Sequence, residues 1–338
     1  MKLANPSLAE TITSAIGDGW VTDLAELQKL KPLAEDAAFR AEVHRAQRAC
    51  KARFADWLRG SLDVTVDPDA VFDCQVKRIH EYKRQLLNAL RIVVLYQRLL
   101  ANPNDPVTPR VFFFAGKAAP AYRLAKIIIK FVNNLAQTMD ADPEVRGRLK
   151  VVFLPEYNVS LAERIIPAAD VSNQISTAGY EASGTSNMKF MMNGALTLGT
   201  RDGATIEMAE EAGEENFFLF GLTADQVESS RGWYNPHWHY DHEPETRRAL
   251  DLIFSDHFSK NESGVFEPLR GVLLTGGDHF MNLADLKSYL QADEKLVATR
   301  RQPDEWARKV THNIAASGKF SSASTNTRPR SGVRSRAR

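Results

Sequence analysis

The chain has 338 residues, 43% of them hydrophobic and 25% charged, which is the composition of an ordinary globular protein. This length suggests two domains or one large α/β unit. The 43 Lys and Arg residues nearly balance the 42 Asp and Glu residues, leaving a formal net charge of +1. That balance excludes a global field that draws the protein to nucleic acid or an anionic membrane, so any anion site must be built locally.

Cysteine content and hydropathy exclude further classes of protein. Cys50 and Cys74 are the only cysteines, which excludes a disulfide scaffold and a cysteine metal cluster. The N-terminus shows no apolar stretch of a signal peptide, and no apolar run approaches the length needed to cross a bilayer, the one at residues 127–129 being cut by Lys126 and Lys130. We therefore expect a cytoplasmic protein without a membrane partner.

Residues 1–60 predict a helical lead-in. Ser7, with Glu10 three residues later, fits a capping box. From Asp36 onward, apolar residues recur at three- and four-residue steps, which predicts a long amphipathic helix ending near Gly60. This stripe comprises Phe39, Val43, Ala46, Cys50, Phe54 and Leu58.

Residues 61–322 then alternate short apolar runs with helical patterns. Strands are expected over residues 64–66, 72–76, 111–115, 151–154, 171–175 and 195–198, and helices over 86–100, 120–135, 160–166 and 187–192. This alternation predicts an α/β fold with a mostly parallel, helix-covered sheet. In such sheets ligands bind at the carboxyl ends of the strands.

A basic run follows the expected strand at residues 72–76. Its potential cations are Lys77, Arg78, His80, Lys83 and Arg84. Lysine supplies a point charge and arginine a planar fork, and both suit a phosphate group. A solvated, basic helix start is the structural alternative.

A second loop, residues 176–189, is rich in Gly and hydroxyl residues and leads into a helix. Such a loop exposes backbone N–H groups and predicts an anion cradle. Lys189, about one turn into the helix, would pair with an anion or form a Schiff base with a carbonyl cofactor. The pattern does not match a Walker motif, and a capping loop with a surface lysine is the alternative.

Two further motifs point to structure more than to chemistry. Gly116 begins a tight strand-to-helix turn, where glycine allows close backbone packing. His237, His239 and His242 have the residue type of metal ligands, but they fall in one short aromatic stretch, so we expect a loop and no metal.

Four segments closely resemble the glycogen (α-glucan) phosphorylase family. They are FDCQVKRIHEYKRQ at residues 72–85, EASGTSNMKF at 181–190, NGALTLGT at 193–200 and GEENFF at 213–218. The likeness runs with little interruption from about Asn5 to Ser322. The resemblance implies a Rossmann-like C-terminal domain of a two-domain GT-B glycosyltransferase.

The resemblance also implies a reaction. Family members use inorganic phosphate to release glucose 1-phosphate from the non-reducing ends of α-1,4-glucans such as glycogen, with retention of configuration. Their cofactor is pyridoxal 5′-phosphate, whose own phosphate takes part in proton transfer with the substrate phosphate. The full-length proteins form homodimers.

Each motif residue then acquires an implied role. Lys189 would hold the cofactor as a Schiff base, Lys77, Lys83 and Thr185 would contact its phosphate, and Tyr157 would lie near it. Arg78 and Lys83 would clamp the substrate phosphate. The glucosyl unit and phosphate would meet Tyr82, Glu181, Ser183 and Gly184.

The chain also departs from the family pattern. Relatives are more than twice as long, Asn158 stands where animal relatives have Arg, and the likeness stops before residues 323–338, an arginine-rich segment that we expect to be a disordered tail. These departures predict a truncated phosphorylase. The alternatives are a fragment that binds the cofactor without turnover, a transaminase-type pyridoxal enzyme, and nucleic-acid binding through the tail, the last two disfavoured.

Overall fold

The computed structural model describes residues 1–104 and 106–320, so the expected tail at 323–338 lies outside the described residues. The strands are β1 (Val71–Val76), β2 (Arg110–Ala115), β3 (Leu149–Leu154), β4 (Val171–Gln174), β5 (Leu196–Thr200) and β6 (Phe218–Phe220). The α-helices are α1 (Pro6–Ile16), α2 (Ala37–Leu62), α3 (Gln85–Ala101), α4 (Arg123–Ala141), α5 (Val159–Ala168), α6 (Ser186–Met192), α7 (Ala204–Ala212), α8 (Ala224–Ser230), α9 (Pro236–His242), α10 (Pro244–Phe254), α11 (Glu267–Arg270), α12 (Asn282–Arg300) and α13 (Pro303–Ala316). The 3₁₀-helical segments are η1 (Gly19–Val21), η2 (Leu24–Glu35), η3 (Glu81–Lys83), η4 (Glu214–Asn216) and η6 (Ser317–Phe320), and η5 (Gly271–Thr275) is a π-helical turn.

The strands form one sheet of six in the order β3-β2-β1-β4-β5-β6, and every neighbouring pair is parallel. The α/β fold expected from the sequence is confirmed, and the order is that of a Rossmann-type sheet. Successive strands are added on one side from β1 to β3 and on the other from β4 to β6. The order therefore reverses between β1 and β4, where open sheets of this type bind ligands.

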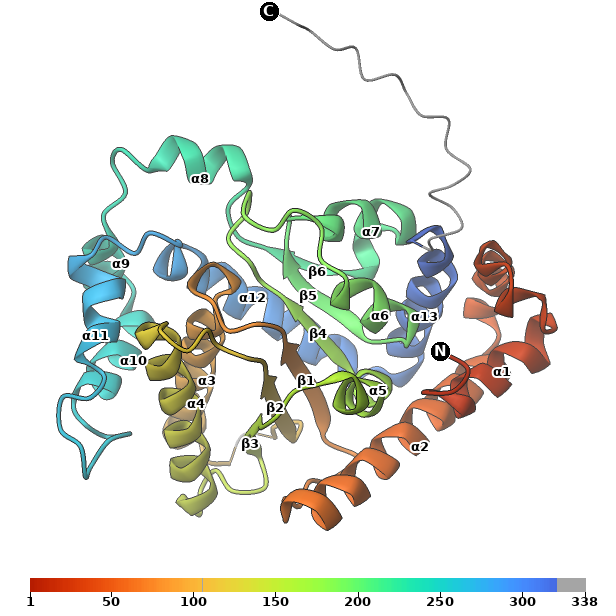
Figure 1. Cartoon of the computed structure of the whole chain (residues 1–338), viewed down its shortest axis with the longest axis horizontal. Helices are drawn as coiled ribbons and strands as arrows, with labels where there is room; N and C mark the ends of the chain where they lie inside the picture. The colour runs from red at the N-terminus through yellow and green to blue at the C-terminus, as the bar shows by residue number, and fades with distance from the viewer. Residues whose placement is uncertain (105, 321–338) are drawn as a thin grey trace, which may run out of the picture.

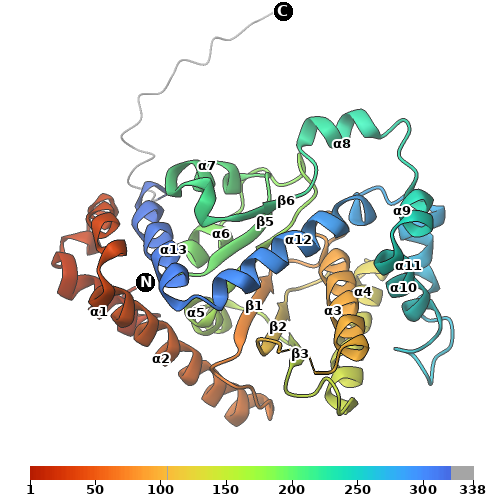
Figure 2. The ribbon, with the colours of Figure 1, turned by 180° about the vertical axis from the view of Figure 1, so that it is seen from behind.

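Helices cover both faces of the sheet. Successive side chains of a strand point to opposite faces, so each strand contributes to both cores. Phe112 and Phe114 of β2 belong to the core with α3, α4 and α12, whereas Val111 and Phe113 belong to the core with α2 and α5. Figure 1 shows α5 in front of the sheet, and Figure 2, seen from behind, shows α12 crossing in front of it. The central strands are therefore buried on both sides.

The long helix α2 matches its expected stripe. The Asp36 side chain accepts a hydrogen bond from the Phe39 amide at 2.9 Å and caps the start of the helix. All six stripe residues are buried. Phe54 reaches the sheet, with ring centroids 5.5 Å from Phe113 and 6.4 Å from Phe72. The lead-in thus packs on the same core as the strands.

Two local expectations are wrong. Helix α1 is capped by Asn5, whose side-chain oxygen accepts from the Leu8 amide at 3.1 Å, and not by Ser7, because Pro6 already supplies the first helical residue. Residues 64–66 form no strand: Val66 is buried against the α2 side of the core, but the segment pairs with no strand among the described residues. Apolar side chains there are buried by packing alone.

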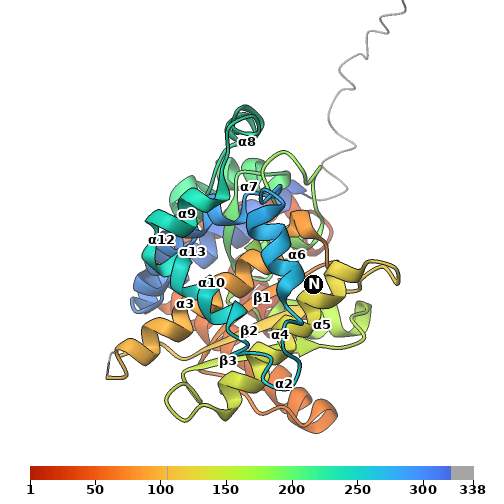
Figure 3. The ribbon, with the colours of Figure 1, turned by 90° about the vertical axis from the view of Figure 1, so that its left-hand side faces the viewer.

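The α8 segment stands out from the body of the molecule (Figure 3). At its base, Val227 packs with Ala178 and Met281 in a small apolar cluster. This cluster connects α8 to the loop that follows β4. Over the described residues, no helix has the length and apolar character needed to cross a membrane.

Candidate active site at the β1–β4 junction

The basic loop, residues 77–84, continues directly from β1. The Lys77 amide donates to the Ala115 carbonyl at 2.9 Å, and the Ile79 amide donates to the Lys117 carbonyl at 3.1 Å. This approach requires glycine at position 116, because a Cβ there would lie 1.9 Å from the Lys77 carbonyl oxygen. The structural interpretation of Gly116 is confirmed, and its effect is to fix where Lys77 leaves the sheet.

Lys77 projects toward the neighbouring strand β4. Its ammonium donates to the Gln174 side-chain oxygen at 2.7 Å. Burial and, to a smaller extent, the nearby charge of Lys83 lower the pKa of Lys77 to about 7, because the carboxylates of Glu181 and Asp202 only partly oppose these effects. Lys77 is therefore a desolvated amine whose direct partner is a neutral amide, a site that favours a bound anion. Sequence reasoning missed Gln174, although its position at the end of β4 marks it.

Lys83 joins the two loops directly. It forms an ion pair with Glu181 and lies 4.6 Å above the centre of the Tyr82 ring, whose hydroxyl is 3.5 Å from the same carboxylate. Burial lowers the pKa of Lys83, but the hydrogen bonds to Glu181 and Tyr82 outweigh it, so the net shift is upward. Lys83 is thus a fixed cation, and three of the expected site residues lie together.

Arg84, the last member of the basic run, plays a different part. Its side chain is fully buried, pairs with Asp285 at 2.6 Å, and donates to the carbonyls of Ile175 at 2.7 Å and Ser176 at 3.2 Å. A fully buried guanidinium whose three nitrogens all donate within the protein is not accessible to a ligand. Arg84 therefore clamps the basic loop to the chain that leaves β4, and is not a phosphate-facing cation.

The glycine-serine loop, residues 176–185, is anchored at its start by Asp202. This carboxylate accepts from the Ser176 hydroxyl at 2.6 Å and from the amides of Gly179 and Glu181, both at 2.9 Å. Gly203 follows with a φ of +52°, and a Cβ there would lie 2.8 Å from the Ser183 carbonyl oxygen. Sequence reasoning missed Asp202, which fixes the position of Glu181 and hence of its bond to Lys83.

The remaining expected residues face solvent. Arg78, Ser183, Thr185 and Lys189 are exposed, and Gly184 is partly exposed with a φ of +86°. Lys189 lies on α6, as expected, and Thr185 precedes that helix without a side-chain cap bond. Within the described part of the chain, the Arg78 guanidinium and the Lys189 ammonium form no ion pair, so their charges are available to a ligand.

Tyr157 follows the end of β3 and is held by apolar packing. It is partly buried against the core cluster that contains Val76 at the end of β1 and Phe190 next to Lys189, and burial raises the pKa of its hydroxyl. The adjacent Asn158 caps α5, accepting from the Leu161 amide at 3.0 Å. Asn158 therefore has a structural role as the N-cap of α5.

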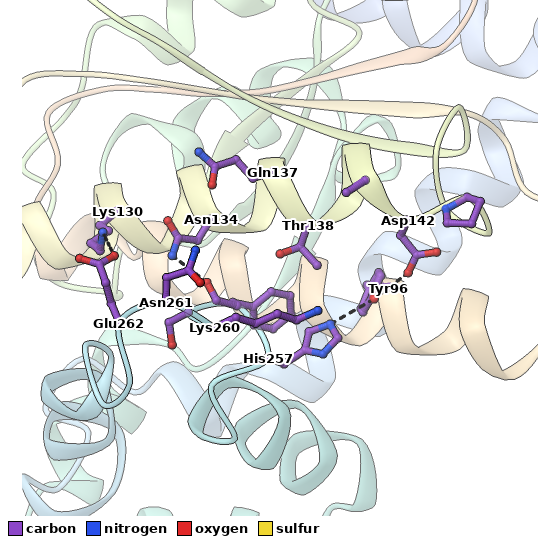
Figure 4. Close-up of a pocket in the computed structure, with 14 residues that line it drawn as sticks. Tyr96, Lys130, Asn134, Gln137, Thr138, Asp142, His257, Lys260, Asn261 and Glu262 are labelled. Atoms are coloured by element: carbon purple, nitrogen blue, oxygen red, sulfur yellow. Dashed lines mark hydrogen bonds and ion pairs between the residues drawn. The ribbon is translucent and has the colours of Figure 1, made fainter.

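Other features lie apart from this junction. The three histidines expected in a loop lie instead on helix α9, where His239 pairs with Glu243 at 3.2 Å, because Asn235 and Pro236 begin a helical turn. Among residues 1–104 and 106–320, no group of three His, Cys, Asp or Glu side chains is placed to hold a metal ion. A cavity of about 760 Å³ lies between α4 and residues 257–262 (Figure 4), and none of the expected site residues lines it.

Comparison with known proteins shows the family of this chain. The carbohydrate phosphorylase family model matches residues 1–328. Human brain-form glycogen phosphorylase is 50% identical over 326 residues, 96% of this chain and 39% of that protein. Glycogen phosphorylases of Synechocystis and, in the muscle form, of rabbit are each 48% identical over 96% of this chain.

The chain spans 38–39% of the length of these relatives. Across that span the likeness includes both loops at the β1–β4 junction, because the matched residues extend over almost the whole sequence. The chain belongs to the carbohydrate phosphorylase family.

Proposed function

We propose that this chain forms the pyridoxal-phosphate- and phosphate-binding half of an α-1,4-glucan phosphorylase. Residues 61–322 would form the Rossmann-like domain of a GT-B architecture, with residues 1–60 as its helical lead-in. The full protein would cleave terminal α-1,4 bonds of glycogen or maltodextrin with inorganic phosphate, releasing glucose 1-phosphate with retention. Family membership and the strand order support this proposal.

The charge balance at the junction fits a phosphorylated cofactor, and this observation carries the proposal. Among the described residues, the Lys77 ammonium bonds to a neutral amide and to no carboxylate, and burial is the main reason why its pKa is lowered to about 7. Arg78 and Lys189 have no ion pair among the described residues, while Glu181 is already used by Lys83. Phosphate dianions would supply the missing negative charge.

The donors divide between two phosphates. Lys77, Lys83 and Thr185 would bind the cofactor phosphate, Arg78 and Lys83 the substrate phosphate, and Lys189 would hold the cofactor, with Tyr157 beside it. When bound, the cofactor supplies a phosphate group that exchanges a proton with the substrate phosphate.

The substrate contacts come from the second loop and from Tyr82. Tyr82, Glu181, Ser183 and Gly184 would orient the glucosyl unit against the attacking phosphate. Glu181 also holds the Lys83 ammonium in place, so that this cation need not reorganise as charge develops at the reacting centre. Two phosphates side by side repel each other strongly, which explains a cluster of cations at one strand edge.

Equilibrium binding tests the proposal on the chain itself. Titration with pyridoxal 5′-phosphate and with pyridoxal should show a preference for the phosphorylated form of roughly a hundredfold or more, as several charge-assisted bonds require. Lys77→Met should remove most of that preference, whereas Lys150→Met, which breaks an exposed pair with Asp140, should not. Equal affinity for the two ligands would contradict the proposal.

Turnover is a separate question, because Ser183, Thr185 and Lys189 are exposed in this chain. A fragment that binds the cofactor without turnover is therefore the second candidate. Release of glucose 1-phosphate from glycogen distinguishes the two. A cytoplasmic homodimer of the full-length protein is part of the same proposal.

A further inference from the structure

The basic loop is connected to a buried lattice of charges beneath it. Arg91 of α3 donates to Asp73 at 2.9 Å and to Asp293 at 2.8 Å, and Arg110 pairs with the same two carboxylates. All four side chains are buried. Well-packed apolar residues of similar volume are often as stable as such a lattice, so stability alone is a weak reason for it.

From Arg91, side-chain hydrogen bonds lead to the basic loop. Arg91 donates to the Asn88 side-chain oxygen at 2.7 Å, and the Asn88 side-chain amide donates to the Gln75 oxygen at 2.9 Å. The Gln75 amide then donates to the backbone carbonyl of Lys83 at 2.9 Å. Gln75 and Asn88 are at most 1% exposed, so water cannot replace these bonds.

Arg91 determines which group donates and which accepts in each of these hydrogen bonds. A guanidinium only donates, so Asn88 must present its oxygen to Arg91 and its amide to Gln75. Gln75 must in turn present its oxygen to Asn88, which leaves its amide facing Lys83. The buried charge thus fixes which end of each amide points toward the loop.

We propose that Gln75 and Asn88 are positioning residues that transmit the orientation of Arg91 to Lys83, and so hold the basic loop ready for phosphate. Neither side chain touches a ligand in this account. The inference rests on the proposed function only where the loop is taken to bind phosphate. The hydrogen-bond relay itself is a property of the loop and can be tested without a ligand.

Asn88→Asp is the sharpest test because it keeps the shape and the bond to Arg91. Its second oxygen would face the Gln75 oxygen, so the Gln75 amide would turn and oppose its oxygen to the Lys83 carbonyl. We expect the preference for pyridoxal 5′-phosphate over pyridoxal to fall roughly tenfold or more, and amides 78–84 to exchange hydrogen faster. Gln75→Met, which removes the relay at similar volume, should change both in the same direction.

Asn313→Asp is the matched control. Asn313 is a buried amide on α13 that also donates to a backbone carbonyl, that of Asn216 at 3.1 Å. It should lower thermal stability without changing ligand preference or exchange of residues 78–84. The same pattern in Asn88→Asp, or in Gln75→Met if Asn88→Asp does not fold, would overturn the inference. If the wild-type chain shows no preference for the phosphorylated ligand, the proposed function fails, and the exchange rates alone decide the relay.

Discussion

The two loops at the β1–β4 junction are held in different ways. The basic loop is fixed along its length, by the backbone bond of Lys77, the relay to Lys83 and the clamp of Arg84. The glycine-serine loop is fixed at its start by Asp202, whereas Ser183, Thr185 and Lys189 beyond it are exposed. The difference shows that the protein itself holds the basic loop in place, whereas the end of the second loop that is proposed to meet the cofactor and the sugar is exposed.

The largest expected effect comes from breaking the clamp that joins the loops. Arg84→Met leaves the buried Asp285 carboxylate unpaired, so we expect a loss of about 3–5 kcal/mol in the free energy of unfolding. Urea unfolding measures it. Arg48→Met, which breaks an exposed pair with Asp69, should change stability only slightly. Equal losses in the two variants would show that Arg84 is no clamp.

The next largest effect concerns the anchor of the glycine-serine loop. Asp202→Asn keeps only one acceptor oxygen for three donors, so we expect a loss of about 1–3 kcal/mol and faster hydrogen exchange over residues 176–184. The basic loop should be affected less, since the relay remains. Asp256→Asn is the control, because Asp256 likewise accepts from three donors, namely the hydroxyls of Ser259 and Ser263 and the Gly264 amide. Equal effects of both variants on residues 176–184 would refute this role of Asp202.

A smaller effect is the pH dependence of stability that arises from the lowered pKa of Lys77. Its pKa is lowered by burial from an ordinary 10.5 to about 7, so the folded chain binds fewer protons than the unfolded chain between these values. Stability should therefore rise with pH from about 7 toward 10, and Lys77→Met should remove that part of the rise. A bound phosphate should restore the charge, with uptake of up to about one proton at pH 8. Calorimetry in buffers of different ionisation enthalpy measures this uptake, and no uptake in the wild type would contradict the account.

The smallest effect tests the exposed part of the second loop. Thr185 makes no side-chain cap bond, so Thr185→Val should change the free energy of unfolding by no more than about 0.5 kcal/mol. It should nevertheless weaken binding of pyridoxal 5′-phosphate a few-fold, as the loss of one hydrogen bond requires. A loss of stability without a change in affinity would show that Thr185 has a structural role and does not contact the ligand.

Much of the fold could be predicted because its signals are local. The apolar runs at β1, β2 and β3 and the stripe on α2 each follow from burial within a single element. Residues 64–66 show the limit, since an apolar run becomes a strand only where a partner strand is available. The capping box at Ser7 fails for a local reason too, since Pro6 suits the first helical position and Asn5 before it becomes the N-cap.

The candidate site was only partly predictable from the sequence. Tyr82, Lys83 and Glu181, which the resemblance names, lie together at the junction, but the sequence gives no sign that Arg84 turns inward. Gln174 and Asp202 bond to partners 97 and 26 residues away in the sequence, and Gln75 bonds to the Lys83 carbonyl in the loop beyond its own strand. Their roles depend on the order of the strands and on buried hydrogen bonds, which no single segment encodes.

The central claim is that this edge of the sheet binds pyridoxal 5′-phosphate with Lys189 as its attachment point. Borohydride reduction of the chain with pyridoxal 5′-phosphate, followed by peptide mapping, tests it most directly. We expect one dominant pyridoxyl label on Lys189, lost in Lys189→Arg and retained in Lys117→Arg. Labels scattered over exposed lysines, or no label on Lys189, would contradict it.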